Sequence, residues 1–445
     1  MGRCHEDNVG FAPAFHIRIR ENFPNSPART PYCPFPWVPD RFPDEAWVPD
    51  VSAVMGELTS TYELPASWPA SLSPEVLSRI DLPTPFLAGD LRLFRDRLDA
   101  FRDALPRVRP FYAVKCNSTP EILRTAAASD AGFEVASLGE LRLLQSLGIE
   151  AADVLYSNTI KPASHIAAAA ADGLWRFSFD SEGELHKIAR HAPGSAVYVR
   201  VRVDDSSSVF PLSRKFGAEA HEARALLHIA RSLGLQPYGI TFHVGSQCTS
   251  TSAWVQAIAS VGRMMRQLKA DGIRIEMLDI GGGFPARYGD PVPSIEQLGQ
   301  VVERALRELL PYEPQLLAAE PGRHLVAETA VLVASVLGRE ERAGEEWLYL
   351  DVGAYNGLME TQQTVGQWRF PLWTSRPDHV VSPQVPYTVT GPTCDSADTM
   401  FYGVPLPTTL GEGDRVFVGT AGAYTLSYAS SFNGFPPPQP YFLPE

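Results

Sequence analysis

Short apolar runs alternate with segments of helical periodicity from residue 84 to about residue 330. Residues 91–105 place their apolar side chains at helical spacing, and apolar runs rich in β-branched and aromatic residues predict strands on either side. The predicted strands cover residues 85–88, 111–114, 132–136, 154–157, 175–179, 196–203, 240–244, 277–280 and 316–319. So many β-then-α units predict an α/β fold whose parallel sheet closes into a TIM-like (β/α)8 barrel, in preference to an open doubly wound sheet.

The pattern changes at both ends of this region. After about residue 330 the helical rhythm fades, and residues 331–337, 347–352, 386–390 and 414–419 read as strands separated by Gly, Pro and Asp turns. Residues 1–80 are rich in proline and aromatics, with the near-repeats 37–40 and 47–50 (both Trp-Val-Pro-Asp), so little regular structure is expected there. We predict an N-terminal extension over residues 1–80, a barrel over 81–330 and a mostly β domain over 331–445.

Composition and charge narrow the classes of protein. The 445 residues are 44% hydrophobic and 20% charged, and no apolar run is long enough to span a membrane. A formal net charge of -13 argues against nonspecific binding to nucleic acid or to an anionic membrane. The five cysteines form neither a disulfide framework nor a metal-binding spacing, and the N-terminus lacks a signal-peptide pattern. We therefore expect reduced thiols, no metal site and a cytoplasmic location.

One lysine stands at the end of a predicted strand. Lys115 follows the apolar run 111–114, at the rim of the expected barrel. Partial desolvation there would lower the pKa of its amine and free the lone pair that a Schiff base requires. The alternative is a lysine that only extends its charge to the surface where a strand leaves the core. The segment alone favours this alternative.

Other predicted strands also end in polar residues. These strand-end residues are Glu134, Ser157, Asn158, Asp180, Arg200, His243, the turn Gly281-Gly282-Gly283, and Glu320. Functional sites of such barrels collect at the C-terminal ends of the strands, so the coincidence indicates a site. For Ser157, Asn158 and Asp180, we favour helix capping over chemistry.

Two of these strand ends suit a phosphorylated cofactor. The turn 281–283 would let backbone N–H groups approach an anion closely. At the next strand end, Arg323 suits a phosphate, and Glu320 could hold a protonated ring nitrogen. A salt-bridged surface turn is the alternative for Glu320 and Arg323.

The ordered motifs resemble those of the fold type III pyridoxal-phosphate (PLP) decarboxylases, most of all the ornithine/lysine decarboxylase branch. The motifs are residues 110–117, 243–246, 281–285, 320–323, 394–398 and 422–425. The resemblance covers the chain from about residue 82 to its C-terminus and leaves the first 80 residues outside. It implies the alanine racemase-like architecture, a barrel followed by a β domain.

The resemblance implies roles for the residues around the cofactor. Lys115 would carry PLP as a Schiff base, His243 would stack on the pyridine ring, and Glu320 would pair with the ring nitrogen. A carboxylate there keeps the nitrogen protonated and the ring a strong electron sink. Relatives that racemise place an arginine at that position, so Glu320 favours decarboxylation. The remaining implied cofactor contacts are Ser246, Gly281, Gly282, Gly283, Gly322, Arg323 and Tyr424 for the phosphate, with Glu134, Glu140 and Arg200 near the cofactor.

The resemblance also implies a homodimer with shared active sites and a small-molecule amino acid substrate. Cys394 matches a thiol that is contributed across the dimer interface and returns a proton to the α-carbon. Asp395 matches the carboxylate that binds the distal cation of the substrate. Tyr355, Glu360 and Gln363 lie in the segment 355–364, which resembles the substrate-specificity element.

Two departures bear on the substrate. Glu134 stands where many relatives have Asp, and Gln363 and Thr364 stand where bacterial relatives often place acids. With fewer carboxylates, the pocket should hold a doubly charged diamino acid less strongly. The expected substrate is therefore an ornithine-like or lysine-like amino acid, or a modified, larger or carrier-linked relative. A catalytically inactive regulatory homologue and a PLP-dependent racemase are the alternative functions.

Overall fold

The computed structural model describes residues 68–364, 368–376 and 382–444, all within one compact unit, Thr59–Glu445. Residues 1–67, which carry most of the proline-rich extension and both Trp-Val-Pro-Asp repeats, lie outside the described part. The last residues of the predicted extension, 68–80, are described. They contain the short helix α1 (Pro74–Ser78), which is capped by the hydroxyl of Ser73. Among the described residues no helix is long and apolar enough to cross a bilayer.

Eight parallel strands close into a barrel, as the alternating pattern predicts. Around the barrel the order is β10-β11-β2-β3-β4-β5-β6-β8. The strands are β2 (Val108–Ala113), β3 (Gly132–Val135), β4 (Val154–Tyr156), β5 (Arg176–Phe179), β6 (Ala196–Val201), β8 (Gln236–Phe242), β10 (Met277–Asp279) and β11 (Leu316–Ala319). The predicted (β/α)8 barrel is confirmed.

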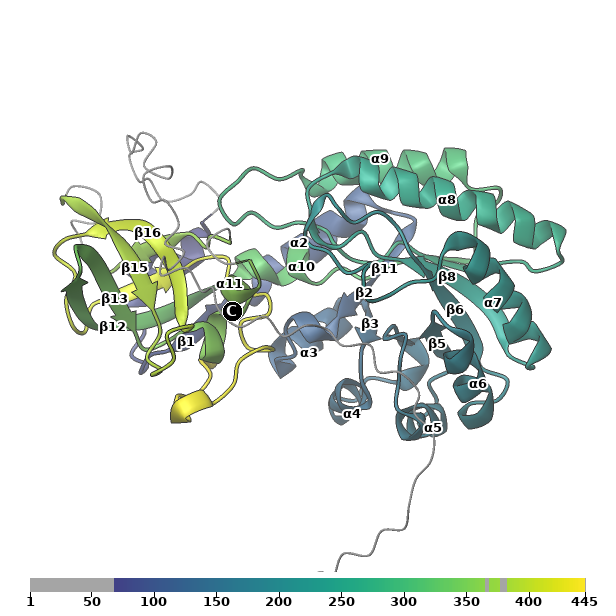
Figure 1. Ribbon diagram of the computed structural model, residues 1–445, viewed down its shortest axis with the longest axis horizontal. Coiled ribbons are helices and arrows are strands. Elements are labelled where there is room, and N and C mark those ends of the chain that lie inside the picture. Colours follow the sequence, from purple (N-terminus) through teal and green to yellow (C-terminus); the bar gives the residue numbers. More distant parts are fainter. Residues whose placement is uncertain (1–67, 365–367, 377–381, 445) are drawn as a thin grey trace, which may run out of the picture. The chain divides into compact units, whose positions relative to one another are not determined.

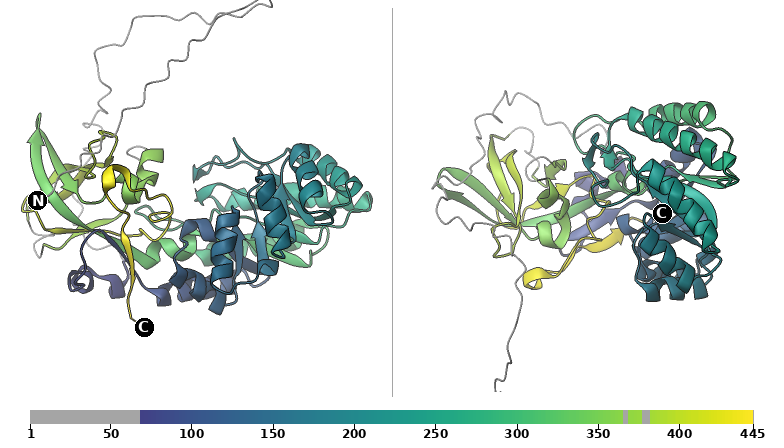
Figure 2. Two further views of the ribbon diagram at one scale, coloured as in Figure 1. Left: turned by 90° about the horizontal axis from the view of Figure 1, so that it is seen from below. Right: turned by 45° about the vertical axis from the view of Figure 1, so that its right-hand side comes forward.

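Helices surround these strands (Figure 1). They are α2 (Leu91–Ala104), α3 (Pro120–Ala128), α4 (Leu138–Ser146), α5 (Ala163–Ala171), α6 (Glu182–His191), α7 (Ala220–Ser232), α8 (Thr251–Ala270) and α9 (Ile295–Leu309). Helix α9 contacts α2, so the ring of helices joins its last member to its first. The further views in Figure 2 show the same arrangement of helices outside strands.

The barrel is filled by side chains rather than open. Phe111, Leu155, Tyr198, Met277 and Ala318, from five different strands, form a fully buried cluster. A parallel strand is covered by helices outside and by such side chains inside, which explains why the barrel strands are short continuous apolar runs.

A mostly β domain contains the remaining large sheet. Its main order is β14-β17-β12-β13-β15-β16, and β1 and β18 extend it beside β12. The strands are β1 (Phe86–Gly89), β12 (Ala330–Arg342), β13 (Glu345–Leu350), β14 (Leu372–Thr374), β15 (Gln384–Thr390), β16 (Thr399–Pro407), β17 (Arg415–Val418) and β18 (Gln439–Phe442). The predicted second, mostly β part is therefore confirmed.

The first predicted strand belongs to this sheet and not to the barrel. We expected residues 85–88 to open the barrel as part of a βαβ unit, and that expectation is wrong. Strand β1 pairs antiparallel with β12, Phe86 opposite Val333, and parallel with β18. A short buried apolar run looks the same in either sheet, so its pattern could not indicate the partner.

Candidate active site

Lys115 lies at the C-terminal end of β2, in the 3-10 turn η3 (Val114–Cys116). Its Nζ forms an ion pair with Glu134, the third residue of β3. The side chain of Lys115 is 40% exposed, whereas that of Glu134 is 2% exposed. The turn is held in place because the buried Tyr112 hydroxyl donates to the carbonyl of Asn117 at 2.8 Å. The amine therefore stays accessible while its partner is buried.

The two carboxylates decide the protonation of this lysine. Burial lowers the pKa of Lys115, but Glu134 and Glu320 together raise it further than burial lowers it, so the net pKa is raised. The expectation that desolvation would lower this pKa is therefore wrong for the geometry observed. Burial also raises the pKa of Glu134 to about 7, despite the ion pair with Lys115. Glu134 is thus a proton acceptor of moderate strength in direct contact with the amine.

Glu320 follows β11 and is buried in a carboxyl-rich network. The Ser157 hydroxyl donates to Glu320 Oε1 and lies 3.0 Å from the Tyr198 hydroxyl. Ser157 is therefore not a helix cap, contrary to the interpretation favoured from the sequence. Burial and the neighbouring Asp279 raise the pKa of Glu320 to about 8.

Sequence reasoning missed Asp279, the last residue of β10. Its carboxylate is fully buried and accepts from the Thr241 hydroxyl at 2.7 Å and from the Gly281 amide at 2.9 Å. A charged residue two positions before a glycine turn was the available signal. Asp279 holds the start of that turn and sets the charge felt by Glu320.

The other two polar residues set aside as caps also have different roles. The side chain of Asn158 donates to the Ala136 carbonyl at 3.2 Å, and Asp180 accepts from the Gly217 amide at 2.9 Å. Both therefore tie loops together at the strand ends.

His243 follows β8 and is held as a neutral imidazole. Burial and the cations of Arg200 and Lys115 lower its pKa well below the usual range. The Gly245 amide donates to His243 Nδ1 at 3.0 Å, which leaves the ring proton on Nε2. Arg200, from β6, lies over the ring of Phe216 at 5.0 Å. A neutral flat ring next to Lys115 suits stacking on an aromatic cofactor.

The glycine turn 281–283 is packed tightly against two other loops. A Cβ on Gly281 would lie 2.0 Å from the Phe242 carbonyl oxygen, and one on Gly283 would lie 2.4 Å from that of Gly245. A Cβ on Gly282 would lie 3.0 Å from His243 Nε2. Side chains are excluded here, which keeps the turn close to the histidine and to the end of β11.

Arg323 begins the short helix α10 (Arg323–Val326) and is buried, with 4% exposure. Its guanidinium donates to the Tyr288 hydroxyl at 2.8 Å, to the Ser246 hydroxyl at 3.2 Å, and to both carboxylate oxygens of Glu360. Ser246 reaches it from β9 (Ser246–Cys248), which pairs with β7 (Ser208–Phe210). The structure thus brings Ser246 and Arg323 together, and adds Tyr288 and Glu360 as partners that we had not predicted.

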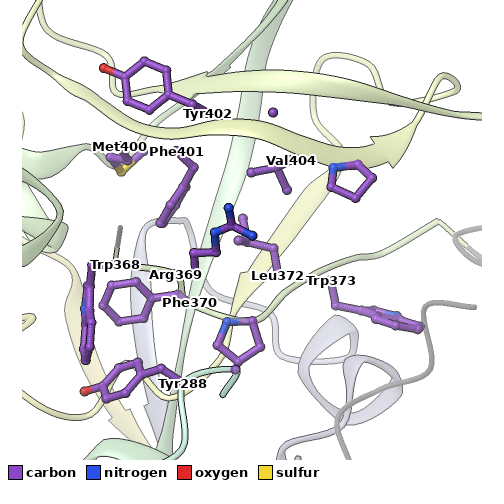
Figure 3. Close-up of a pocket in the computed structure, with 14 residues that line it drawn as sticks. Tyr288, Trp368, Arg369, Phe370, Leu372, Trp373, Met400, Phe401, Tyr402 and Val404 are labelled. Carbon is purple, nitrogen blue, oxygen red and sulfur yellow. The ribbon is translucent and has the colours of Figure 1, made fainter. Parts of the chain in front are cut away.

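Aromatic rings enclose this guanidinium. It lies 4.8 Å from the ring of Tyr424 and 5.4 Å from that of Trp368. Tyr288 and Trp368 also line a neighbouring cavity of about 240 Å³, together with Phe370 and Phe401 (Figure 3). None of the charged residues around Lys115 lines that cavity.

Two loops are pinned to the Lys115 turn. The Tyr424 amide donates to the Cys116 carbonyl at 2.8 Å, and Asn117 donates to the Gly422 carbonyl at 3.0 Å. A Cβ on Gly322 would lie 2.9 Å from that of Cys116. The residues predicted to hold a phosphate therefore come together beside Lys115, except that the donors of Arg323 face protein groups.

The residues predicted to bind substrate form a second group. The Tyr355 hydroxyl donates to Asp395 at 2.7 Å, and the Cys394 thiol donates to the Asn433 side chain at 3.3 Å. Cys394, Asp395 and Gln363 are exposed. Within the described residues, no hydrogen bond or ion pair links these three to Lys115, Glu134 or Glu320. In the described residues these side chains therefore form a group of their own, apart from the group around Lys115.

The second group is held by a buried acid that carries no substrate role in our prediction. Asp398 accepts from the Ala354 amide at 2.7 Å and from the Thr393 hydroxyl at 2.8 Å. A Cβ on Gly353 would lie 2.2 Å from its carboxylate, so only glycine fits there. Asp398 thus fixes the loop of Cys394 to the π-helix Ala354–Leu358 that carries Tyr355.

No cluster of His, Cys, Asp and Glu in the described part could hold a metal ion.

Comparisons with known proteins match this chain to the same family that its sequence motifs resemble. Residues 91–327 match the family model for the pyridoxal binding domain of pyridoxal-dependent decarboxylases. The chain is 36% identical to lysine/ornithine decarboxylase of Selenomonas ruminantium over 80% of this chain and 88% of that protein. It is also 36% identical to antizyme inhibitor 2 of Xenopus laevis, over 75% of each chain. A solved lysine decarboxylase of Selenomonas ruminantium, in complex with PLP and cadaverine, superposes with a TM-score of 0.75 at 34% identity, covering 83% of this chain and 93% of its own.

Proposed function

Because the chain belongs to the family of PLP-dependent decarboxylases, in its ornithine/lysine branch, we propose that it decarboxylates a basic amino acid or a derivative of one. Amino acid decarboxylation with PLP is the activity of the family. The observation that carries the proposal for this chain is the placement of Lys115 between the buried carboxylates of Glu134 and Glu320. This group lies at the C-terminal ends of the barrel strands, where such folds place their chemistry.

The residues present fit PLP. An accessible amine, a neutral imidazole and a buried carboxylate stand together, and side chains are excluded from the glycine turn beside them. When bound, PLP supplies an electron sink for the pair of electrons left when CO2 departs. Lys115 would hold the cofactor, His243 would pack on its ring, and Ser246 would contact its phosphate.

Proton positions follow from the same network. Glu134 would hold the proton on Lys115 Nζ, since the two groups are in direct contact and the carboxylate of Glu134 raises the pKa of the amine. Glu320 would share a proton with a ring nitrogen, because burial and Asp279 raise the pKa of Glu320 to about 8. Cys394 would return a proton to the α-carbon of the product.

The β-domain residues support a substrate with one distal cation or a modified distal end. The backbone amide of Ala397 and the hydroxyl of Tyr355 lower the pKa of Asp395, so it stays ionised and can bind a cationic group. Glu360 faces Arg323 instead of adding a second charge to this group, and Gln363 is neutral. Fewer available carboxylates favour a derivatised or larger amino acid over free ornithine or lysine.

The proposal includes a homodimer in the cytoplasm. Cys394 and Asp395 are exposed in one chain, as expected if a partner subunit completes each site. The described cysteines Cys116, Cys248 and Cys394 are free thiols, which is in keeping with a reducing compartment.

The test is reduction of the purified protein with borohydride, followed by peptide mass analysis and a screen for CO2 release. We expect a pyridoxyl adduct on Lys115 and its loss in Lys115→Ala. The screen compares free, acylated and carrier-linked amino acids, and rapid turnover of free ornithine and lysine would argue against a modified substrate. A chain without the adduct would overturn the proposed activity.

Similarity to antizyme inhibitor 2 favours one second candidate, an inactive regulator of a true decarboxylase. The intact charged group around Lys115 argues against it, and the Lys115 adduct together with CO2 release would exclude it. A racemase is disfavoured by Glu320, and exchange of α-deuterium without CO2 release would revive that alternative.

A further inference from the structure

Every N–H group of the Arg323 guanidinium already donates a hydrogen bond to another group of the protein. A guanidinium has five N–H groups, and here Nε and Nη2 donate to Ser246 at 3.2 and 3.3 Å. The remaining donors of Nη1 and Nη2 reach Tyr288 and the two oxygens of Glu360. A phosphate can bond to Arg323 only if one of these partners leaves. Ser246, in contrast, accepts from the arginine and keeps its own O–H free to donate.

Burial explains why the arginine has a carboxylate partner. The side chains of Arg323 and Glu360 are only 4% and 6% exposed. An unpaired charge at such a depth is strongly destabilising, because the guanidinium has lost its hydration and has no counter-ion. Of the partners of Arg323, only Glu360 carries a negative charge, so Glu360 neutralises the guanidinium whenever no other anion does so.

Glu360 also belongs to the predicted substrate element. It is the first residue of α11 (Glu360–Gln363), which is separated by one residue from the π-helix that carries Tyr355. In the same helix, the Gln362 side chain donates to the Thr399 carbonyl at 2.9 Å and ties α11 to β16. A single carboxylate therefore joins the group around Arg323 to the segment that presents Tyr355.

We propose that Glu360 is a positioning residue that occupies the guanidinium of Arg323 in place of a phosphate, and that the cofactor phosphate competes with Glu360 for this arginine. The inference rests on the proposed function, since it takes PLP as the anion. It deepens that function, because it makes Glu360 part of the cofactor site and not a group that binds substrate. Binding of the phosphate releases the N-terminus of α11, so loading of the cofactor acts on the substrate element.

The test measures anion affinity in full-length protein freed of PLP. Glu360→Gln removes the charge with little change in shape, and the buried arginine then lacks a counter-ion until an anion binds. We expect the variant to bind inorganic phosphate and PLP about tenfold more tightly than the unmodified protein. Pyridoxal, which lacks the phosphate, should bind both proteins equally. The thermal midpoint of the cofactor-free variant should fall, and phosphate should recover it.

Glu184→Gln is the matched control. Glu184 is a buried carboxylate, 2% exposed, paired with Lys161 and Lys187 away from Arg323. This variant should lose stability without any gain in phosphate affinity. If Glu360→Gln cannot be purified, Glu360→Asp serves, because its shorter arm weakens the bidentate pair; phosphate should then bind about threefold more tightly.

Equal or weaker phosphate affinity in both Glu360 variants would overturn the inference, since Ser246 would then bind the anion while the ion pair stays intact. The inference about Glu360 and the proposed function can be refuted independently of each other. An unmodified protein that binds inorganic phosphate but forms no Lys115 adduct with PLP would refute the decarboxylase proposal, while the phosphate comparison would still decide the role of Glu360.

Discussion

A raised carboxyl pKa makes stability depend on pH. Burial and Asp279 raise the pKa of Glu320 from an ordinary value of 4.5 to about 8. Between those two values the folded state holds a proton on Glu320 that the unfolded state has released, so the contribution of this group to the free energy of unfolding of the cofactor-free protein falls as pH rises from 4.5 to 8. The slope from this one group is at most about 1.4 kcal/mol per pH unit. The raised pKa of Lys115 acts only above its ordinary value of 10.5, outside this window.

Glu320→Gln should remove this contribution and change the slope of the profile between pH 4.5 and 8, because its side chain does not titrate. Urea unfolding at intervals between pH 5 and pH 8 measures it, with Glu313→Gln as the control at an exposed carboxylate. Parallel profiles for the unmodified protein and Glu320→Gln would contradict the assignment. The Glu320→Gln variant should also lose CO2 release by about a hundredfold or more, since the carboxyl that would share a proton with the ring nitrogen of the cofactor is missing.

Asp395, in the β domain, should act on binding more than on rate. Its carboxylate is exposed and oriented by Tyr355 and Ala397. Asp395→Asn keeps the shape and removes the charge, so we expect KM to rise about tenfold or more for a cationic substrate, with a smaller change in kcat. Steady-state kinetics measure this, and an acylated substrate without the distal cation should show no such increase. An equal fall of kcat for both substrates would instead give Asp395 a role in the chemistry.

Sequence reasoning identified the charged residues of the site better than their partners. Lys115, Glu320 and Arg323 were found because each stands at the end of a buried apolar run. The pKa of Lys115 was predicted with the wrong sign because the sequence shows burial but not the carboxylates that face it. The partners Asp279, Tyr288 and Glu360 come from other segments, and only the closed barrel and the β domain bring them together.

The turn after β10 allows the cost of an added side chain to be separated from backbone strain. Gly281 has φ +67° and a Cβ position 2.0 Å from the Phe242 carbonyl oxygen. Gly148 has a similar φ of +81° but nothing within 4 Å. Gly148→Ala should therefore destabilise by about 1 kcal/mol, the cost of the left-handed backbone alone. Gly281→Ala should cost at least twice as much, because the loop after β8 must move.

Chemical denaturation of both variants gives the difference in stability, and titration with PLP shows whether the movement reaches the site. Weaker cofactor binding is expected only in Gly281→Ala, because the displaced loop carries His243. Equal stability of the two variants would mean that the turn accommodates the added methyl group without a further loss of stability.

Comparison of the predicted strands with the observed ones shows which parts of the fold the hydrophobic pattern specifies. All eight barrel strands were predicted, since burial on both faces makes each a continuous apolar run. Strand β1 was recognised but placed in the wrong sheet, because its partners β12 and β18 lie more than 200 residues away along the chain. Strands β14, β16 and β18 were missed; β16 contains Gly403, Pro405 and Pro407, which read as turns.

The separation of Lys115 from Cys394 leads to a testable prediction about assembly. Lys115 lies on the barrel, whereas Cys394 is exposed on the β domain and, among the described residues, is hydrogen-bonded to Asn433. If each site combines Lys115 of one subunit with Cys394 of the other, then Lys115→Ala and Cys394→Ala chains should each be nearly inactive as homodimers. A mixed dimer would contain one site with both residues intact and one with neither.

Refolding or co-expressing the two variants in equal amounts should therefore restore about a quarter of the normal CO2 release, since half of the dimers are mixed and each of these has one complete site. The control is a mixture of Lys115→Ala with Glu320→Gln. Both of these residues lie on the barrel, so no mixed dimer has a complete site and no activity should return. If the Lys115 and Cys394 variants also fail to complement each other, although mixed dimers form, then each site is built within a single chain. In that case the loop 394–398 must move to reach Lys115.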